Sequence, residues 1–202
     1  MILYKYMPKT RMEFWDNLLL RFTQPSAFND PYDCMASHSW LPEKLMPGNS
    51  GFQDLAALFF DIEEASSKFN DNWGILCLSE DVKSILMWSH YSENHSGYVV
   101  GFDATHPFFA LNQKPGTNQV KYCPTRPQSS QGNLYDELCT KLDVWSYEKE
   151  WRLCKQVSKA DKVVGSKEEP IYLFRLPPEA IHSVHFGIRT PESIVSASKD
   201  DV

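Results

Sequence analysis

The sequence predicts an α+β fold: one domain with a central, mostly antiparallel sheet of short strands and with helices concentrated in the N-terminal half. Its 202 residues are within the length that one core supports, and 42% of them are hydrophobic. Helical spacing of apolar residues is found early in the chain, whereas short stretches of β-forming residues follow one another late. We expect a single domain over residues 1–190, a helical insert at about 52–70 and a tail at 191–202.

The first half of the chain is predicted to contain two strands and two helices. Residues 2–6 alternate and are rich in β-formers, which indicates a strand. Thr10 is placed to cap a helix over residues 11–20, with Glu13 three positions later completing a capping box. The remaining expected elements are an extended segment from 21–23, a loop at 39–51, a helix at about 52–69 and a buried strand at 73–79.

The second half is predicted to be rich in strands. A helical turn at 84–91 and a polar loop precede a strand at 97–102. Leu138 and Leu142 are one helical turn apart, which predicts a helix over 134–144. The other expected elements are strands at 119–122, 150–157, 171–176 and 183–188, a charged hairpin connection at 160–170 and a helical turn at 178–181.

Charge and cysteine content restrict the class of protein. A net charge of −6 and a pI near 5.5 argue against broad nucleic-acid binding or binding to anionic membranes. No apolar stretch reaches the roughly 20 residues that span a bilayer, and the start of the chain lacks the apolar segment of a signal peptide. The five cysteines form no C-x-x-C pair, so we expect reduced thiols in a cytoplasmic protein.

Two polar stretches with aromatic neighbours are candidate sites. In FNDPYD, Asn29 and Asp30 precede a proline, which is typical of a structural turn but also suits a turn that holds a ligand. The stretch 85–103 gathers Trp88, His90, Tyr91 and His95 at its centre. Buried polar groups without partners are costly, so such a cluster is either a satisfied network or a site. Ser79, at the end of the predicted strand 73–79, is a further candidate.

The third polar stretch, YEKEWR, carries a pair of carboxylates. On a strand, Glu148, Glu150 and Arg152 share one face. Two neighbouring carboxylates repel each other, which raises the pKa of one of them unless Arg152 compensates. The pair could bind a sugar hydroxyl, deprotonate a nucleophile or stabilise an oxocarbenium-like centre. The alternative is an exposed, ion-paired strand face.

Other chemistries lack their sequence patterns. Ser89 and His90 are adjacent and therefore cannot meet as nucleophile and base, and no G-x-S-x-G elbow, P-loop or G-x-G-x-x-G motif is present. His90, His95 and Asp103 lack the spacing of a metal site, so no metal is expected. A metal-dependent nuclease that uses the two histidines is the third-ranked of three functional hypotheses.

Taken together, the FNDP turn, the MWSHYSENHSG segment and the YEKEWR segment resemble a widespread bacterial family of uncharacterised proteins, over Leu3 to about Gly187. Members often carry Glu where this chain has Asp33. The order of parts is also distantly similar to that of the ADP-ribosyltransferase fold. In that fold a late E-x-E strand supplies a glutamate that orients the nicotinamide ribose of NAD.

This second resemblance implies roles for individual residues. Glu150 would be the catalytic carboxylate and Glu148 its helper, with Tyr91 or Trp88 stacking on nicotinamide. Lys5 stands in the first strand where His or Arg is usual. The complete set expected to bind the nucleotide-like ligand is Lys5, Tyr6, Asn29, Asp30, Ser79, Trp88, His90, Tyr91, His95 and Arg152.

The function implied is that of an NAD-consuming ADP-ribosyltransferase or NAD glycohydrolase, such as a toxin or phage-defence effector. NAD would be a substrate, and the macromolecular target stays open. The second-ranked hypothesis is a non-catalytic nucleotide- or protein-binding module in which the polar stretches form a structural network.

Overall fold

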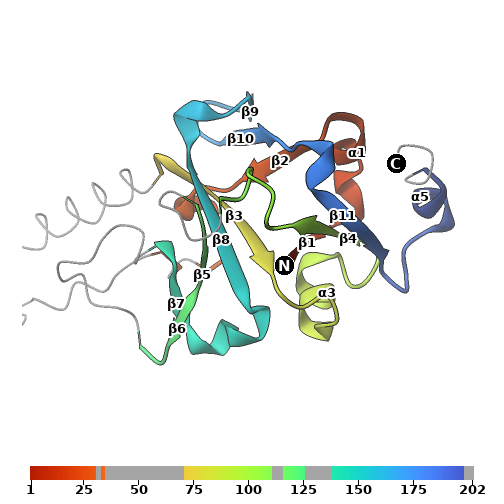
Figure 1. The fold of residues 1–202 in the computed structure, drawn as a ribbon, viewed down its shortest axis with the longest axis horizontal. Helices are drawn as coiled ribbons and strands as arrows, with labels where there is room; N and C mark the ends of the chain where they lie inside the picture. Colours follow the sequence, from red (N-terminus) through yellow and green to blue (C-terminus); the bar gives the residue numbers. More distant parts are fainter. Residues whose placement is uncertain (31–32, 35–70, 111–115, 126–137, 198–202) are drawn as a thin grey trace, which may run out of the picture.

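A six-stranded antiparallel sheet forms the centre of the computed structural model, which describes residues 1–30, 33–34, 71–110, 116–125 and 138–197 (Figure 1). The predicted loop at 39–51 and helix at 52–69 lie outside these residues. The strands of the sheet, in spatial order, are β11 (Ile181–Phe186), β4 (Tyr98–Asp103), β1 (Ile2–Met7), β3 (Trp73–Ser79), β8 (Glu150–Gln156) and β5 (Thr117–Gln119).

Strand β3 lies in the middle of this sheet, as its apolar sequence predicted. It pairs with β8 along its whole length, from Trp73 opposite Gln156 to Ser79 opposite Glu150. Its pairing with β1 is limited to Tyr4 opposite Ser79, whereas β1 pairs with β4 over all six residues. The backbones of β1 and β3 therefore pair at one position, where β3 ends.

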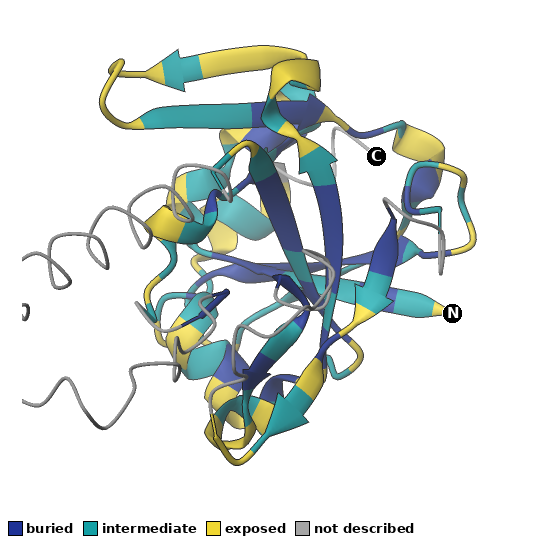
Figure 2. Cartoon of the chain, turned by 90° about the vertical axis from the view of Figure 1, so that its left-hand side faces the viewer, coloured by how far each residue is buried: buried dark blue, intermediate teal, exposed yellow. Residues whose placement is uncertain are grey.

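A second antiparallel sheet, in the order β2 (Leu19–Phe22), β10 (Pro170–Arg175) and β9 (Lys162–Gly165), packs against the first. The main core lies between the sheets, where Phe22 and Phe174 have ring centroids 4.4 Å apart. In Figure 2 buried residues follow the central strands, and the hairpin of β9 and β10 is more exposed. The segment 160–170, predicted as a connection, thus contributes a strand of its own.

The helix predicted over residues 11–20 is much shorter. A 3-10 turn at Lys9–Arg11 precedes α1 (Glu13–Asn17), and Thr10 makes no capping hydrogen bond. Leu18 has a left-handed backbone (φ 51°) and its amide donates to Phe14 O, which ends the helix. The prediction was wrong because the next residues bury their side chains as strand β2, paired with β10.

Helix α3 (Ile85–Tyr91) and the turn after it match the prediction closely. The Ser84 side chain caps the helix by accepting from the Met87 amide at 3.4 Å. The chain then turns back into β4 at Gly97, whose amide donates to Ser92 O at 2.8 Å. A Cβ atom on Gly97 would lie 2.1 Å from Met7 O, so no larger residue fits there.

The predicted helix over residues 134–144 is wrong over residues 140–144. Strand β7 (Thr140–Leu142) pairs in parallel with β6 (Lys121–Cys123), and a 3-10 helix, η4 (Asp143–Glu148), follows. The strand brings Lys141 into the interior, between partly exposed Thr140 and Leu142. The strand predicted at 119–122 is divided between β5 and β6.

The remaining described elements are short. They are 3-10 helices η2 (Pro25–Ala27), η5 (Val157–Lys159) and η6 (Pro178–Ala180), and helix α5 (Glu192–Ala197). The prediction of a mixed α and β fold around an antiparallel sheet is confirmed, and helix α5 lies within the tail predicted at 191–202. Within the residues that the structure describes, no helix has both the length and the apolar character needed to cross a bilayer.

Candidate functional site

A cavity of about 270 Å³, here called the acidic cavity, lies where β1 and β3 separate. Neighbouring strands supply Lys5 from β1, Ser79 from β3 and Glu150 from β8 to its lining. Lys5 bridges the gap between the first two strands, because its Nζ atom donates to Cys77 O at 3.0 Å. Burial lowers the pKa of Lys5, and the negative charge of Glu150 counters part of that effect.

Five buried charged side chains form the floor of the acidic cavity and the layer beneath it. They are the carboxylates of Asp33, Glu148 and Glu150 and the cations of Lys141 and Arg152. Buried charges are tolerated only when they are paired and hydrogen-bonded. With three carboxylates and two cations, the cluster has a formal charge of −1 when every group is ionised.

Arg152 is the fully buried centre of this cluster. Its Nε and Nη2 atoms donate to the two carboxylate oxygens of Glu150, at 2.8 and 3.0 Å. Nη2 also donates to Asp33 Oδ2 at 2.7 Å, and Nη1 donates to Leu138 O at 2.8 Å. The guanidinium therefore fixes the Glu150 carboxylate and does not itself line the cavity.

Lys141 is the second cation and bridges all three carboxylates. Its Nζ atom lies 2.6 Å from Glu148 Oε2, 3.2 Å from Glu150 Oε2 and 3.3 Å from Asp33 Oδ2. Burial alone would lower its pKa, but the three negative charges raise it above the ordinary value. Lys141 therefore stays protonated and holds the two glutamates beside each other.

The two glutamates have pKa values shifted in opposite directions. Burial, assisted by the charge of Glu150, raises the pKa of Glu148, against the opposing effects of Lys141 and of the Tyr91 hydroxyl, which donates to Glu148 Oε1 at 2.6 Å. Burial also acts on Glu150, but the charges of Arg152 and Lys141 hold its pKa well below the ordinary value. Glu150 is thus a fixed anion, and Glu148 is the group that can take up and release a proton.

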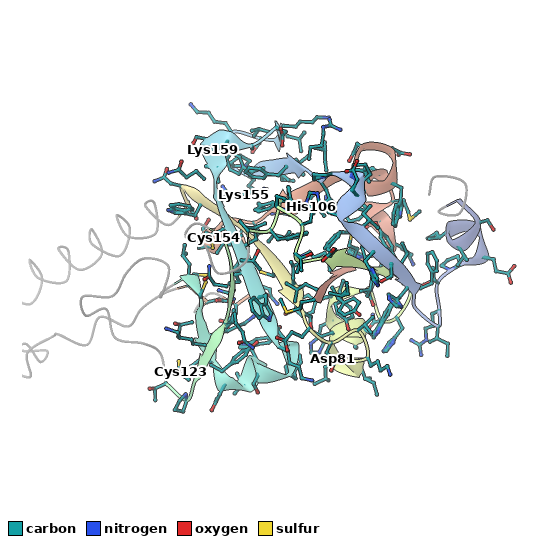
Figure 3. The ribbon with its side chains drawn as sticks, viewed as in Figure 1. Asp81, His106, Cys123, Cys154, Lys155 and Lys159 are labelled. Carbon is teal, nitrogen blue, oxygen red and sulfur yellow. The ribbon has the colours of Figure 1, made fainter. Side chains whose placement is uncertain are left out.

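Ser79 and Tyr6 have backbone partners beside this pair. The Ser79 hydroxyl donates to Glu148 O at 2.6 Å, which ties β3 to the end of η4. The Tyr6 hydroxyl donates to Asp81 O at 2.5 Å. In Figure 3, Asp81 lies near α3, whereas Lys155 is far from it, toward the other end of β8.

The cysteines near the cavity are suited to packing rather than nucleophilic chemistry. Burial raises the pKa of the Cys77 thiol, which lines the cavity, and of the Cys34 thiol beneath it. None of the five cysteines, all of which are among the described residues, forms a disulfide. Because the thiolate is the reactive form, these two groups are poor nucleophiles.

Most of the predicted site residues meet at this cavity. Tyr91 and Asn29 line it together with the residues from β1, β3 and β8 described above. The exposed-face alternative for the carboxylate pair is wrong, because Glu148 and Glu150 are each only 3% exposed. Glu148 reaches the same side from η4 rather than from the strand, since Lys149 has a left-handed backbone and β8 begins only at Glu150.

The other predicted ligand contacts do not line the cavity. The Trp88 ring donates to Val82 O at 2.7 Å and stacks on His95, with ring centroids 6.3 Å apart. His90 is exposed and lies 3.2 Å from the Tyr147 hydroxyl. Asp30 accepts from Trp145 Nε1 at 2.8 Å. These contacts support the parts of the fold around the cavity.

Sequence reasoning missed Lys141 as a site residue and left Asp33 without a role. Lys141 was assigned to a helix, where its neighbours gave no reason to expect burial. A strand over residues 140–142 would have set the Lys141 side chain on the face opposite Thr140 and Leu142, but no local signal marks that face as the interior. Asp33 was noted only for replacing the Glu of other members, yet it completes the pairing of Arg152.

In the part of the chain that the structure describes, no group of three or more His, Cys, Asp or Glu side chains is arranged to hold a metal ion. Neither the curated proteins nor the solved structures include a match to the chain. A family model does match residues 87–153, which run from the start of the MWSHYSENHSG segment to the end of YEKEWRL. The resemblance to an uncharacterised family is therefore confirmed for this central third of the chain, which matches the family described as Protein of unknown function (DUF2971).

Proposed function

We propose that the acidic cavity binds NAD and that the protein cleaves its bond between nicotinamide and ribose, passing ADP-ribose to water or to a macromolecular target. The observation that carries the proposal is the meeting of Lys5, Ser79 and Glu150, from three neighbouring strands, at one cavity. The distant resemblance to the ADP-ribosyltransferase fold assigns roles to two of these residues, Lys5 and Glu150. A role as a toxin or phage-defence effector belongs to this proposal.

The two carboxylates suit the two requirements of this reaction. As the glycosidic bond breaks, both of its electrons go to the nicotinamide nitrogen and positive charge develops on the ribose. Glu150, held ionised by Arg152 and Lys141, would stabilise that charge. Glu148, whose pKa is raised, would take the proton of the attacking hydroxyl group as it bonds to the ribose.

The test uses the full chain and NAD labelled in its adenylate half. Release of nicotinamide reports cleavage, and label on protein or nucleic acid reports transfer. We expect Glu150→Gln to lower turnover by at least about 100-fold, the scale for loss of a charge-stabilising group. Glu179→Gln, at an exposed carboxylate away from the cavity, is the matched control.

The proposal fails if the native chain releases nicotinamide no faster than Glu150→Gln and transfers no label. A melting curve of each variant shows that it is folded. Melting with NAD or ADP-ribose then measures binding separately from turnover, because ligand at about 100 times its Kd raises stability by about 2.7 kcal/mol.

A second candidate function is a non-catalytic binding module. The observation that favours it is the pairing of the charged cluster, in which Arg152 and Lys141 together contact all three carboxylates. In this second candidate function, the network has the structural role of joining β8, β7 and the segment of Asp33. Ligand-dependent stabilisation without any turnover would favour this module over the enzyme.

A further inference from the structure

A second cavity, of about 290 Å³, adjoins the acidic cavity and has the opposite charge. The two share four lining residues, among them Lys5 and Tyr91. Beyond Lys5 the second cavity is lined by Arg11 and Arg21, so we call it the basic cavity. Lys5 stands at the junction of the two.

Arg21 is the most informative residue of the basic cavity. It extends from β2, and its Nε atom is buried without a hydrogen-bond partner among the described residues. Burial lowers the pKa of Arg21, and the positive charge of Arg11 lowers it further. A buried donor on a cation is costly when it has no partner. An anion bound beside this guanidinium would offset the cost of its uncompensated charge.

The side chains around Arg21 do not neutralise it. Among the described residues, Glu13 is the only carboxylate that lines the basic cavity, and it pairs loosely with Arg11 at 3.5 Å on a largely exposed surface. The Lys5 ammonium uses one donor on Cys77 O and retains two. The lining thus has three cations and one carboxylate, an excess of positive charge at a cavity large enough for one or two phosphate groups.

We infer that the basic cavity binds a phosphate or diphosphate group of the same ligand whose ribose enters the acidic cavity, with Arg21 and Arg11 as its main contacts. Guanidinium groups match the oxygens of phosphate with two parallel hydrogen bonds. The substrate class is then a phosphorylated nucleotide rather than a free nucleoside or sugar. The placement of the ribose in the acidic cavity rests on the proposed function. The binding of an anion in the basic cavity does not depend on it.

The experiment is thermal denaturation of the full chain with increasing inorganic pyrophosphate, at an ionic strength held constant with chloride. We expect a saturable rise of the melting midpoint, and an apparent affinity at least about tenfold weaker in Arg21→Gln. Arg189→Gln removes an exposed guanidinium that lines neither cavity and should respond like the native chain.

Because Arg21 Nε has no partner to lose, Arg21→Gln without ligand should melt no lower than the native chain. Arg21→Lys, which keeps the charge but loses the two-point contact, should bind with intermediate affinity. No rise in the native chain, or an equal rise in Arg21→Gln, overturns the inference.

Two further measurements separate this inference from the proposed function. Pyrophosphate binding by a native chain that does not cleave NAD would support the anion site while the proposed function fails. Cleavage of NAD with the same KM in Arg21→Gln and the native chain would overturn the anion site while the proposed function stands.

Discussion

Arg152 holds Glu150 by two parallel hydrogen bonds, Nε to Oε1 at 2.8 Å and Nη2 to Oε2 at 3.0 Å, with the guanidinium fully buried. This two-point contact fixes the carboxylate plane without any help from solvent. It also explains why Arg152, although part of the same sequence motif as Glu150, positions that carboxylate and does not line the cavity.

Replacing Arg152 by Met should destabilise the protein strongly. Among the described residues, the change leaves Lys141 as the ion-pair partner of the buried Asp33 and Glu150, and breaking a buried pair costs about 3–5 kcal/mol. Urea unfolding followed by circular dichroism measures the loss. A loss below about 1 kcal/mol would contradict the central place of Arg152.

Glu148→Gln should change how stability depends on pH. The folded chain holds the Glu148 proton more tightly than the unfolded chain, where its pKa is near 4.5, so ionising it reduces native stability as pH rises above that value. The variant has no such proton to lose. Its melting temperature relative to the native chain should therefore increase from pH 4 to pH 7, and a constant difference would refute the raised pKa.

Glu150→Gln should show the opposite trend. The pKa of Glu150 is lowered in the folded chain, so its contribution to stability is complete above about pH 4.5 and is lost as the pH falls below that value. The native chain should be clearly more stable than the variant at pH 7, and the difference should shrink toward pH 3. Melting curves over this range, with Glu179→Gln as control, test the sign.

Tyr91→Phe removes the hydroxyl that donates to Glu148 at 2.6 Å and keeps the ring that lines the cavity. A hydrogen bond to a buried carboxyl contributes about 1–3 kcal/mol, so we expect a loss in that range. Tyr147→Phe is the matched control, because its hydroxyl lies 3.2 Å from exposed His90, its one hydrogen-bond partner among the described residues. Equal losses of stability for the two changes would show that the Tyr91 contact contributes no more than the contact between Tyr147 and His90.

Lys155 lies away from the cavity, over the rings of Phe108, Phe22 and Phe174, and burial lowers its pKa to about 8. The unfolded chain binds this proton more tightly, so native stability rises with pH between about 8 and 10.5. Lys155→Met should be more stable than the native chain at pH 7, with an advantage that fades by pH 10. Lys159→Met, at an exposed neighbour, should show no such change.

The parts of the fold that the sequence predicted are those with strong local signals. The apolar run of β3 and the alternation of β1 each specify their element without distant contacts. Alternation along β8 likewise placed Glu150 and Arg152 on one face. Lys141 was missed because its burial depends on the parallel pairing of β7 with β6, which no local pattern reveals. The early end of α1 depends in the same way on β10, more than 140 residues later.

The contact between Asp33 and Arg152 joins residues 119 positions apart, and that between Tyr91 and Glu148 joins residues 57 apart. Contacts of such separation form only after most of the chain has been ordered, because closing long loops costs entropy that must be offset by other contacts. The acidic cavity therefore needs distant parts of the chain to be in place together. Ligand binding there would report the completed fold, and a ligand would protect the protein from proteolysis by stabilising that final state alone.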